Sequence, residues 1–133
     1  MKAIQIQRYM TESPHTIGFD QTLAQAHALL REFHIRHLPV LRGGRLAGIL
    51  SERDLALIES LRDVRLDLPV EEAMSPEVYA VAPTTPLEEV VSDMATRRYG
   101  CAVIVQNQKV VGIFTAVDAC RVFAELLQGR LAH

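Results

Sequence analysis

The sequence contains no tryptophan, and only 5% of its residues are aromatic. Proteins that bind single-stranded nucleic acid stack the bases on aromatic side chains, so this chain has little with which to do so. Its formal net charge of −2 provides no basic field for nucleic acid or for anionic lipid. We therefore expect neither a nucleic acid nor a membrane surface as a partner.

Long hydrophobic runs are also missing. No apolar stretch approaches the roughly 20 residues that a transmembrane helix needs, and residues 1–8 lack the apolar core of a signal peptide. These absences predict a cytoplasmic protein. Hydrophobic residues make up 49% of the chain and charged residues 23%, which is typical of a globular domain.

Cysteine is scarce, and the two cysteines, Cys101 and Cys120, show neither metal-ligand spacing nor the density of a disulfide scaffold. Histidine is more frequent, but none of the five has a carboxylate or cysteine nearby at a convincing ligand spacing. No Ser-His-Asp set, glycine-rich phosphate loop or paired-carboxylate motif stands out. We expect no metal site, no required cofactor and no enzymatic activity.

The sequence does contain an internal repeat. A shift that places Gly48 on Gly112 aligns the chain with itself without a gap, and it keeps apolar residues on apolar residues at most core-like positions. The same shift places Ser51 on Thr115 and Asp54 on Asp118. A duplication of this kind indicates two copies of one supersecondary unit packed with pseudo-twofold symmetry. The expected units are residues 1–64 and 65–133, with a linker over 60–69.

Each copy is predicted to have the order β-α-β-β-α, which gives an α/β fold of the α+β type. The first helix is expected to begin near Asp20 and the matching helix of the second copy at a Thr85 capping box. A hairpin follows each helix, with turns at Gly43-Gly44 and at Asn107-Gln108. The closing helices are expected to begin at Ser51 and at Thr115.

The repeated stretch of glycine, hydroxyl residue and aspartate occurs where a strand runs into a helix. A hydroxyl with an aspartate three residues later can cap the helix by binding its free N–H groups. The same N–H groups and the helix dipole also attract phosphate. Either role, or both together, is consistent with Ser51 and Asp54 and with Thr115 and Asp118.

Three further motifs accompany these stretches: Met-Thr-Glu-Ser-Pro-His-Thr-Ile at 10–17, Met-Ser-Pro-Glu-Val-Tyr-Ala-Val at 74–81 and Ile-Arg-His-Leu-Pro-Val at 35–40. With them the chain resembles a tandem pair of cystathionine-β-synthase-type (CBS) domains, a Bateman module, over nearly its whole length. The resemblance implies a regulatory protein that binds an adenosine-containing ligand such as AMP, ADP, ATP or S-adenosylmethionine. It also implies a homodimer that signals to a regulated protein not yet identified.

The resemblance assigns ligand contacts in two clefts, with the aspartates taking the ribose hydroxyls and the helix-start hydroxyls binding ribose or phosphate. Gly48 and Gly112 would let a strand pass close to the ligand. The first cleft would use Thr16, Ile17, Arg36, His37, Leu38, Pro39, Ser51, Arg53 and Asp54. The second would use Ala80, Val81, Gly100, Cys101, Ala102, Thr115 and Asp118.

The two clefts differ in charge. Thr16 is replaced by Ala80, the Arg36-His37 pair by Gly100-Cys101, and Arg53 by Val117. Arg97 and Arg98 are the cations available to compensate. Since a phosphate needs charge-assisted donors, a phosphate-bearing ligand is predicted to bind the first cleft first.

Two other functions stay open. The chain could be a dimerisation or interaction scaffold with empty clefts, or a thiol redox sensor that uses Cys101. For the dimer, the helical stripe Leu23, His27, Leu30 and His34 is either the edge of a core or an interface. As an interface, it would loosen when its histidines are protonated near pH 6.

Overall fold

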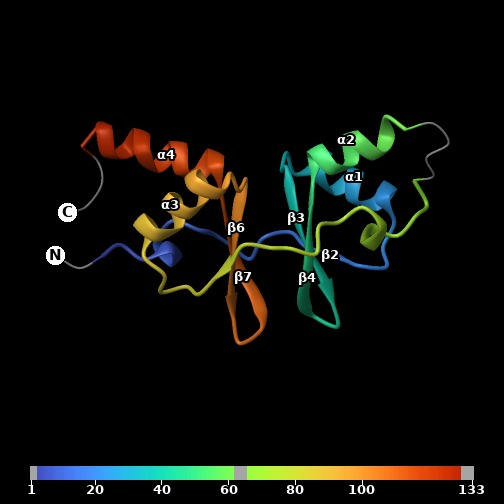
Figure 1. The fold of residues 1–133 in the computed structure, drawn as a ribbon, viewed down its shortest axis with the longest axis horizontal. Helices are drawn as coiled ribbons and strands as arrows, with labels where there is room; N and C mark the ends of the chain where they lie inside the picture. Colours follow the sequence, from blue (N-terminus) through green and yellow to red (C-terminus); the bar gives the residue numbers. More distant parts are fainter. Residues whose placement is uncertain (1–2, 62–65, 130–133) are drawn as a thin grey trace. The chain divides into compact units, whose positions relative to one another are not determined.

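The computed structural model describes residues 3–61 and 66–129 of the chain, and it divides into two compact units (Figure 1). One unit is His15–Val78, and the other combines Met1–Pro14 with Tyr79–His133. The expected boundary between residues 64 and 65, and the middle of the expected linker, lie outside the described residues. That boundary stays a prediction about the sequence repeat.

The unit His15–Val78 has the predicted order of elements, followed by one short 3₁₀ turn. The elements are β2 (Ile17–Gly18), α1 (Leu23–Glu32), β3 (His37–Arg42), β4 (Arg45–Ser51), α2 (Glu52–Glu59) and η2 (Val70–Glu72). Strand β2 pairs with β3 in parallel, and β3 pairs with β4 in antiparallel, so β3 is the central strand. Both helices lie on one face of this sheet (Figure 1).

The other unit repeats this order with the N-terminal segment of the chain added to it. Its elements are η1 (Ile6–Arg8), β1 (Thr11–Glu12), β5 (Ala80–Val81), α3 (Leu87–Arg97), β6 (Cys101–Gln106), β7 (Lys109–Thr115) and α4 (Ala116–Leu127). The sheet order is β1-β7-β6-β5, with β5 parallel to β6 and the other pairs antiparallel. The predicted β-α-β-β-α fold class is confirmed in both copies.

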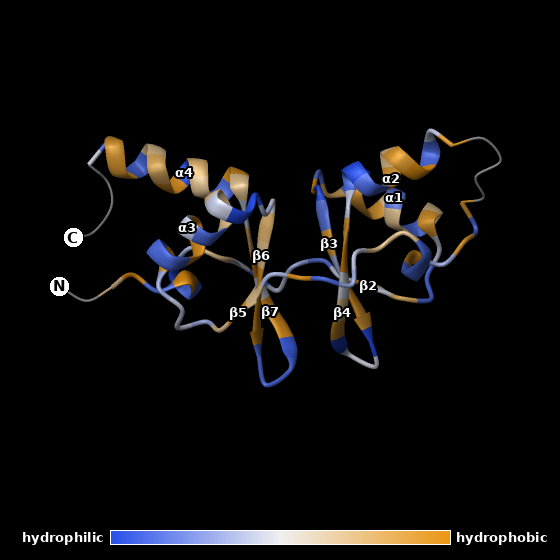
Figure 2. Cartoon of the chain, viewed as in Figure 1, coloured by the Kyte–Doolittle hydropathy of each residue, from blue (hydrophilic) through white to orange (hydrophobic). Residues whose placement is uncertain are grey.

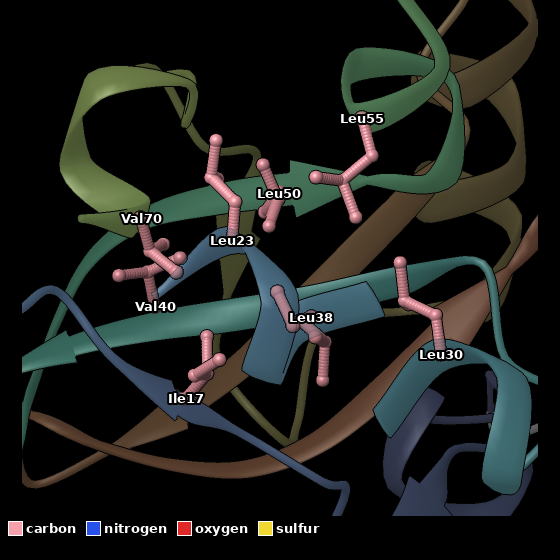
Figure 3. Close-up of a cluster of buried hydrophobic side chains, with 9 residues drawn as sticks. Ile17, Leu23, Leu30, Leu38, Val40, Leu50, Leu55 and Val70 are labelled. Atoms are coloured by element: carbon pink, nitrogen blue, oxygen red, sulfur yellow. The ribbon is translucent and has the colours of Figure 1, made fainter. Parts of the chain in front are cut away.

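The core of the unit His15–Val78 is a cluster of aliphatic side chains between its sheet and its two helices. Figure 3 shows side chains of α1, α2, the sheet strands and η2 turned toward one another. Val70 of η2 is fully buried among them, although it lies far along the chain from the helices that it contacts. The labelled members are Ile17, Leu23, Leu30, Leu38, Val40, Leu50, Leu55 and Val70.

The leading segment of each repeat packs on the sheet of the other repeat. The first repeat begins with η1 and β1, and Ile6 of η1 is fully buried in the core under α3, while β1 pairs with β7. The second repeat begins with η2, whose Val70 donates its N–H to the Gln21 carbonyl. Ser75 then bridges to Ile49 of β4. This exchange explains why the compact units are not the sequence repeats.

The two hairpin turns and the starts of the closing helices are confirmed, but two helix starts differ from the prediction. Gly43 and Gly44, and likewise Asn107 and Gln108, have positive φ angles between paired strands, as two-residue hairpin turns require. Helix α1 begins after Thr22, not Asp20, because Thr22 and Gln25 form a reciprocal capping box. Helix α3 begins after Pro86 and has no side-chain cap.

Of the two alternatives for the α1 stripe, the core is confirmed for its apolar members and an interface is excluded for them. Leu23 and Leu30 belong to the core of their own unit, and they are almost inaccessible to solvent. His27 makes an intrachain contact of 2.7 Å from Nδ1 to Glu59 Oε1 on α2. Periodicity showed that this helix has an apolar face but did not show which surface that face meets.

Candidate ligand-binding site

The first candidate site is built on the N-terminus of α2. Ser51 ends β4 and caps the helix: its Oγ accepts a hydrogen bond of 3.0 Å from the Asp54 backbone N–H. Asp54 completes the capping box, since its Oδ2 accepts a 3.0 Å hydrogen bond from the Ser51 N–H. Its other oxygen, Oδ1, has no partner in the described part of the chain. The aspartate therefore caps the helix and still presents one acceptor.

The second candidate site has the same construction at the N-terminus of α4. Thr115 Oγ1 accepts a hydrogen bond of 3.2 Å from the Asp118 N–H, and Asp118 Oδ2 accepts one of 2.9 Å from the Thr115 N–H. Asp118 differs from Asp54 at its second oxygen, because Oδ1 accepts a 3.0 Å hydrogen bond from Arg121 of the same helix. Both oxygens of Asp118 are therefore engaged.

The residue opposite each helix cap comes from the neighbouring strand. His37 is the register partner of Ser51, and Cys101 is the register partner of Thr115. The preceding connections also match, because the first helical N–H of α2 donates to the Arg36 carbonyl and that of α4 to the Gly100 carbonyl. The structure thus brings Arg36 and His37 to one cap, and Gly100 and Cys101 to the other.

His37 is the most unusual side chain near the first cap. Its Nδ1 is buried and has no hydrogen-bond partner in the described part of the chain. Burial lowers the pKa of His37, although the negative charge of Asp54 acts in the opposite direction. A neutral imidazole nitrogen can donate or accept, but the buried Nδ1 reaches a ligand only when the ring rotates.

The two arginines predicted for the first site remain available. Arg36 is exposed and its Nε lies 3.8 Å from Glu52 Oε2, which is a long, solvent-screened contact. Arg53 is exposed and makes no ion pair with any residue that the structure describes. A cation in the first turn of a helix is unfavourable beside the positive end of the dipole unless an anion is bound there.

Several predicted contacts belong to the core and not to an open surface. The side chains of Ile17, Leu38 and Pro39 are buried in the unit His15–Val78, while Thr16 is half-buried. In the other unit Ala102 is fully buried, Ala80 is exposed and Val81 is half-buried. The polar members of the predicted set, apart from Thr16 before β2, therefore lie at or opposite the two helix caps, and the apolar members mainly pack.

Cys101 lies in the buried part of β6, and burial raises the pKa of its thiol to about 12. At neutral pH the side chain is therefore a thiol, and the thiolate is the form that reacts. Among the described residues no group of three or more histidine, cysteine or acidic side chains can hold a metal ion. Within the same ranges, no helix combines the length and apolar character needed to cross a membrane.

The structure explains the glycines at positions 48 and 112 differently from the prediction, by the packing of other parts of the chain against them. A Cβ on Gly48 would lie 2.6 Å from Met74 Sδ and 2.7 Å from the Ser75 carbonyl oxygen. A Cβ on Gly112 would collide with Met10 Sδ. The expectation that these glycines admit a ligand is corrected: their missing side chains admit the methionine that begins each sequence motif.

A cavity of about 660 Å³ opens between α1 and α2 of the unit His15–Val78. Of the predicted contacts its lining includes Arg36, and its walls combine an apolar floor with charged groups of both signs. The lining residues are His27, Leu30, Arg31, His34, Ile35, Arg36, Glu52, Leu55, Ala56 and Glu59.

Sequence reasoning missed Arg121. The sequence suggested Arg97 and Arg98 as the cations of the second site, whereas in the described structure Arg121 is the cation that hydrogen-bonds Asp118. The signal for Arg121 was its position three residues after Asp118 on a helix, a spacing that brings two side chains together.

Comparison with known proteins gives a consistent result. The family model for the CBS domain matches residues 5–59 and again residues 70–125. The CBS domain-containing protein YhcV of Bacillus subtilis is 31% identical over 109 residues, which cover 82% of this chain and 78% of that protein.

Solved structures agree over most of the chain. A putative acetoin utilization protein (AcuB) from Vibrio cholerae has a TM-score of 0.86 and 32% identity, covering 96% of this chain and 95% of that one. The CBS domain pair of protein MJ0100, solved with 5′-methylthioadenosine and S-adenosyl-L-methionine, has a TM-score of 0.82 and 23% identity. That match covers 94% of this chain and 99% of the other.

Proposed function

This chain belongs to the CBS-domain family, and we propose that it is a regulatory module that binds an adenosine-containing ligand and signals to a partner protein. The observation that carries this proposal lies at the capped N-terminus of α2, where Asp54 Oδ1 has no partner among the described residues and the neighbouring strand brings His37, with its unpartnered Nδ1, opposite the cap. The MJ0100 pair, which shares the fold, was solved with two adenosine derivatives, and this similarity supports the ligand class.

The chemistry at the first site suits a nucleotide. A ribose has neighbouring hydroxyl donors, and a carboxylate oxygen that keeps free lone pairs is an acceptor for them. The α2 dipole, Arg36 and Arg53 provide positive charge for a phosphate. Rotation of the His37 ring would bring its Nδ1 to the same ligand, so binding would satisfy an atom that is buried and unpartnered in the described structure.

We further propose that the module acts as a homodimer and responds to its ligand through differential affinity for two arrangements. Apolar side chains exposed on α4 support a self-associating surface on that unit, and Figure 2 shows the apolar character of this helix. The alternative of a ligand-free scaffold rests on the same surface. The redox alternative is disfavoured because burial keeps Cys101 protonated.

Substitution of Asp54 tests this function. Asp54→Ala removes both the cap and the proposed ribose acceptor, and it should weaken binding by about 1.5–3 kcal/mol, or on the order of ten- to a hundredfold. Asp54→Asn keeps an oxygen acceptor and should lose less ligand affinity than Asp54→Ala. Binding is measured by thermal shift and calorimetry with AMP, ADP, ATP and S-adenosylmethionine, and a ligand at 100 times its Kd should add about 2.7 kcal/mol of stability.

Glu32→Ala is a suitable control, because Glu32 is an exposed carboxylate at the end of α1. It should leave the affinity unchanged. If no adenosine derivative stabilises the wild-type protein at millimolar concentration, the scaffold replaces the sensor as the function. If Asp54→Ala binds as tightly as wild type, the ligand is held elsewhere.

A further inference from the structure

We propose that Arg121 sets the ligand preference of the second candidate site, so that this site selects phosphate-bearing adenosine derivatives over neutral nucleosides. The proposal rests on the proposed function and adds a specificity-determining residue to it. It concerns the unit that contains α4, and it follows from the pairing of Asp118 with Arg121.

The pairing leaves no oxygen of Asp118 without a hydrogen bond, so a ligand hydroxyl at Oδ1 has to share that oxygen with the guanidinium. Oδ2 is used by the Thr115 N–H at 2.9 Å and Oδ1 by Arg121 at 3.0 Å. The Asp118 side chain is only 11% exposed, whereas that of Arg121 is 65% exposed. A nearly buried carboxylate is therefore held by an exposed cation that approaches it from the solvent side.

A ligand hydroxyl that binds Oδ1 competes with the Arg121 guanidinium for space and charge at that oxygen. A ribose hydroxyl that takes over Oδ1 displaces or crowds the guanidinium, and a neutral nucleoside offers the guanidinium nothing in return. Because exposed ion pairs are weak, at about 0.2–1 kcal/mol, this costs a neutral ligand up to roughly fivefold in affinity. A phosphate offers the displaced guanidinium a new anionic partner through a charge-assisted bond.

The first repeat provides an internal comparison. The shift that aligns Asp54 with Asp118 places Leu57 on Arg121, and Leu57 is an exposed side chain of α2. In the described part of the chain Asp54 Oδ1 has no competing donor. The equivalent aspartates therefore differ: Asp118 is held by a cation, and Asp54 is not held by one among the described residues. On this proposal the difference comes from the residue three positions later, which is Arg121 in one repeat and Leu57 in the other.

The test measures AMP and adenosine binding by calorimetry in an Asp54→Ala background, in which the second site is isolated. We expect Arg121→Leu to lower the affinity for AMP by roughly tenfold, which is the low end for loss of a charge-assisted bond. Adenosine affinity should stay equal or rise slightly. Arg121→Lys keeps the charge and should retain most of the AMP preference. The reciprocal Leu57→Arg, in an Asp118→Ala background, should raise the ratio of AMP to adenosine affinity at the first site.

The outcomes separate the two proposals. If the wild-type chain binds neither ligand, the proposed function fails and this inference fails with it. If the wild type binds both ligands but Arg121→Leu changes neither affinity, or lowers both equally, the inference alone is wrong. Circular dichroism of each variant checks folding, and Arg121→Gln provides a second neutral substitution that keeps polarity on this exposed side of α4.

Discussion

At the scale of single residues, the two aspartates show how one side chain combines structural and binding roles. Asp54 uses one oxygen to cap α2 and leaves the other without a partner in the described structure, whereas Asp118 uses both. The capping boxes could be predicted from the sequence because every atom involved lies within four residues. The state of the second oxygen was not predicted, since it depends on which neighbouring side chain reaches it, and the i,i+3 spacing of Asp118 and Arg121 was the local sign of that pairing.

His37 predicts a pH dependence of stability. Burial lowers its pKa in the folded state below the unfolded value of about 6.5. Above that value the folded and unfolded states are both neutral at this residue, so it has no effect on stability. As the pH falls below about 6.5, the unfolded chain takes up a proton that the folded chain resists, and the free energy of unfolding decreases by linkage.

We therefore expect His37→Gln to flatten the fall in the free energy of unfolding between about pH 7 and pH 5, measured by urea denaturation. Each unit by which the pKa is lowered corresponds to about 1.36 kcal/mol. His34→Asn is the control, because His34 is exposed and its φ of 52° lies in a region that asparagine tolerates. Parallel pH profiles for wild type and His37→Gln would show that this residue does not couple folding to protons.

At the scale of elements, the order of strands and helices followed from local patterns. The turns at Gly43-Gly44 and Asn107-Gln108 were predictable because two-residue hairpins need positive φ at both positions. The start of α1 was mispredicted because Asp20 and Thr22 are both good caps, and only Thr22 is followed three residues later by a glutamine that bonds back to its N–H. No local pattern indicated that Met10, which is distant in the chain, packs against Gly112.

The apolar side of α4 gives a prediction about assembly. Phe123 is 59% exposed, and Leu126 and Leu127 are exposed beside it on the last turns of the helix. If this surface forms the homodimer interface, Phe123→Asp removes a burial of about 1.5–3 kcal/mol and should weaken the dimer at least tenfold. Sedimentation at micromolar concentration and pH 7.5 measures the effect.

Gln106→Asp adds the same charge at the exposed end of β6 and should leave the dimer intact. A wild-type protein that sediments as a monomer under these conditions would rule out the homodimer. A dimer that survives Phe123→Asp would place the interface on another surface.

At the scale of the whole molecule, the exchange of leading segments decides where the chain can be divided. The repeat suggests a cut near residue 64, but the fragment 1–64 lacks Val70 and Met74, which pack on its own core, and it retains Ile6, which belongs to the other core. The fragment 15–78 keeps Val70 and Met74 and leaves Ile6 out.

We therefore predict that fragment 15–78 unfolds cooperatively in urea and that fragment 1–64, which is equally long, is much less stable. Full burial of one large aliphatic side chain contributes about 1.5–3 kcal/mol, and a domain of this size has a total stability near 5 kcal/mol. Loss of Val70 and its neighbours therefore removes most of the free energy of unfolding of the fragment. Val70→Ala within fragment 15–78 should move it toward the behaviour of 1–64. Equal stability of the two fragments would mean that η2 adds little to the core, and the sequence repeat would then also be the folding unit.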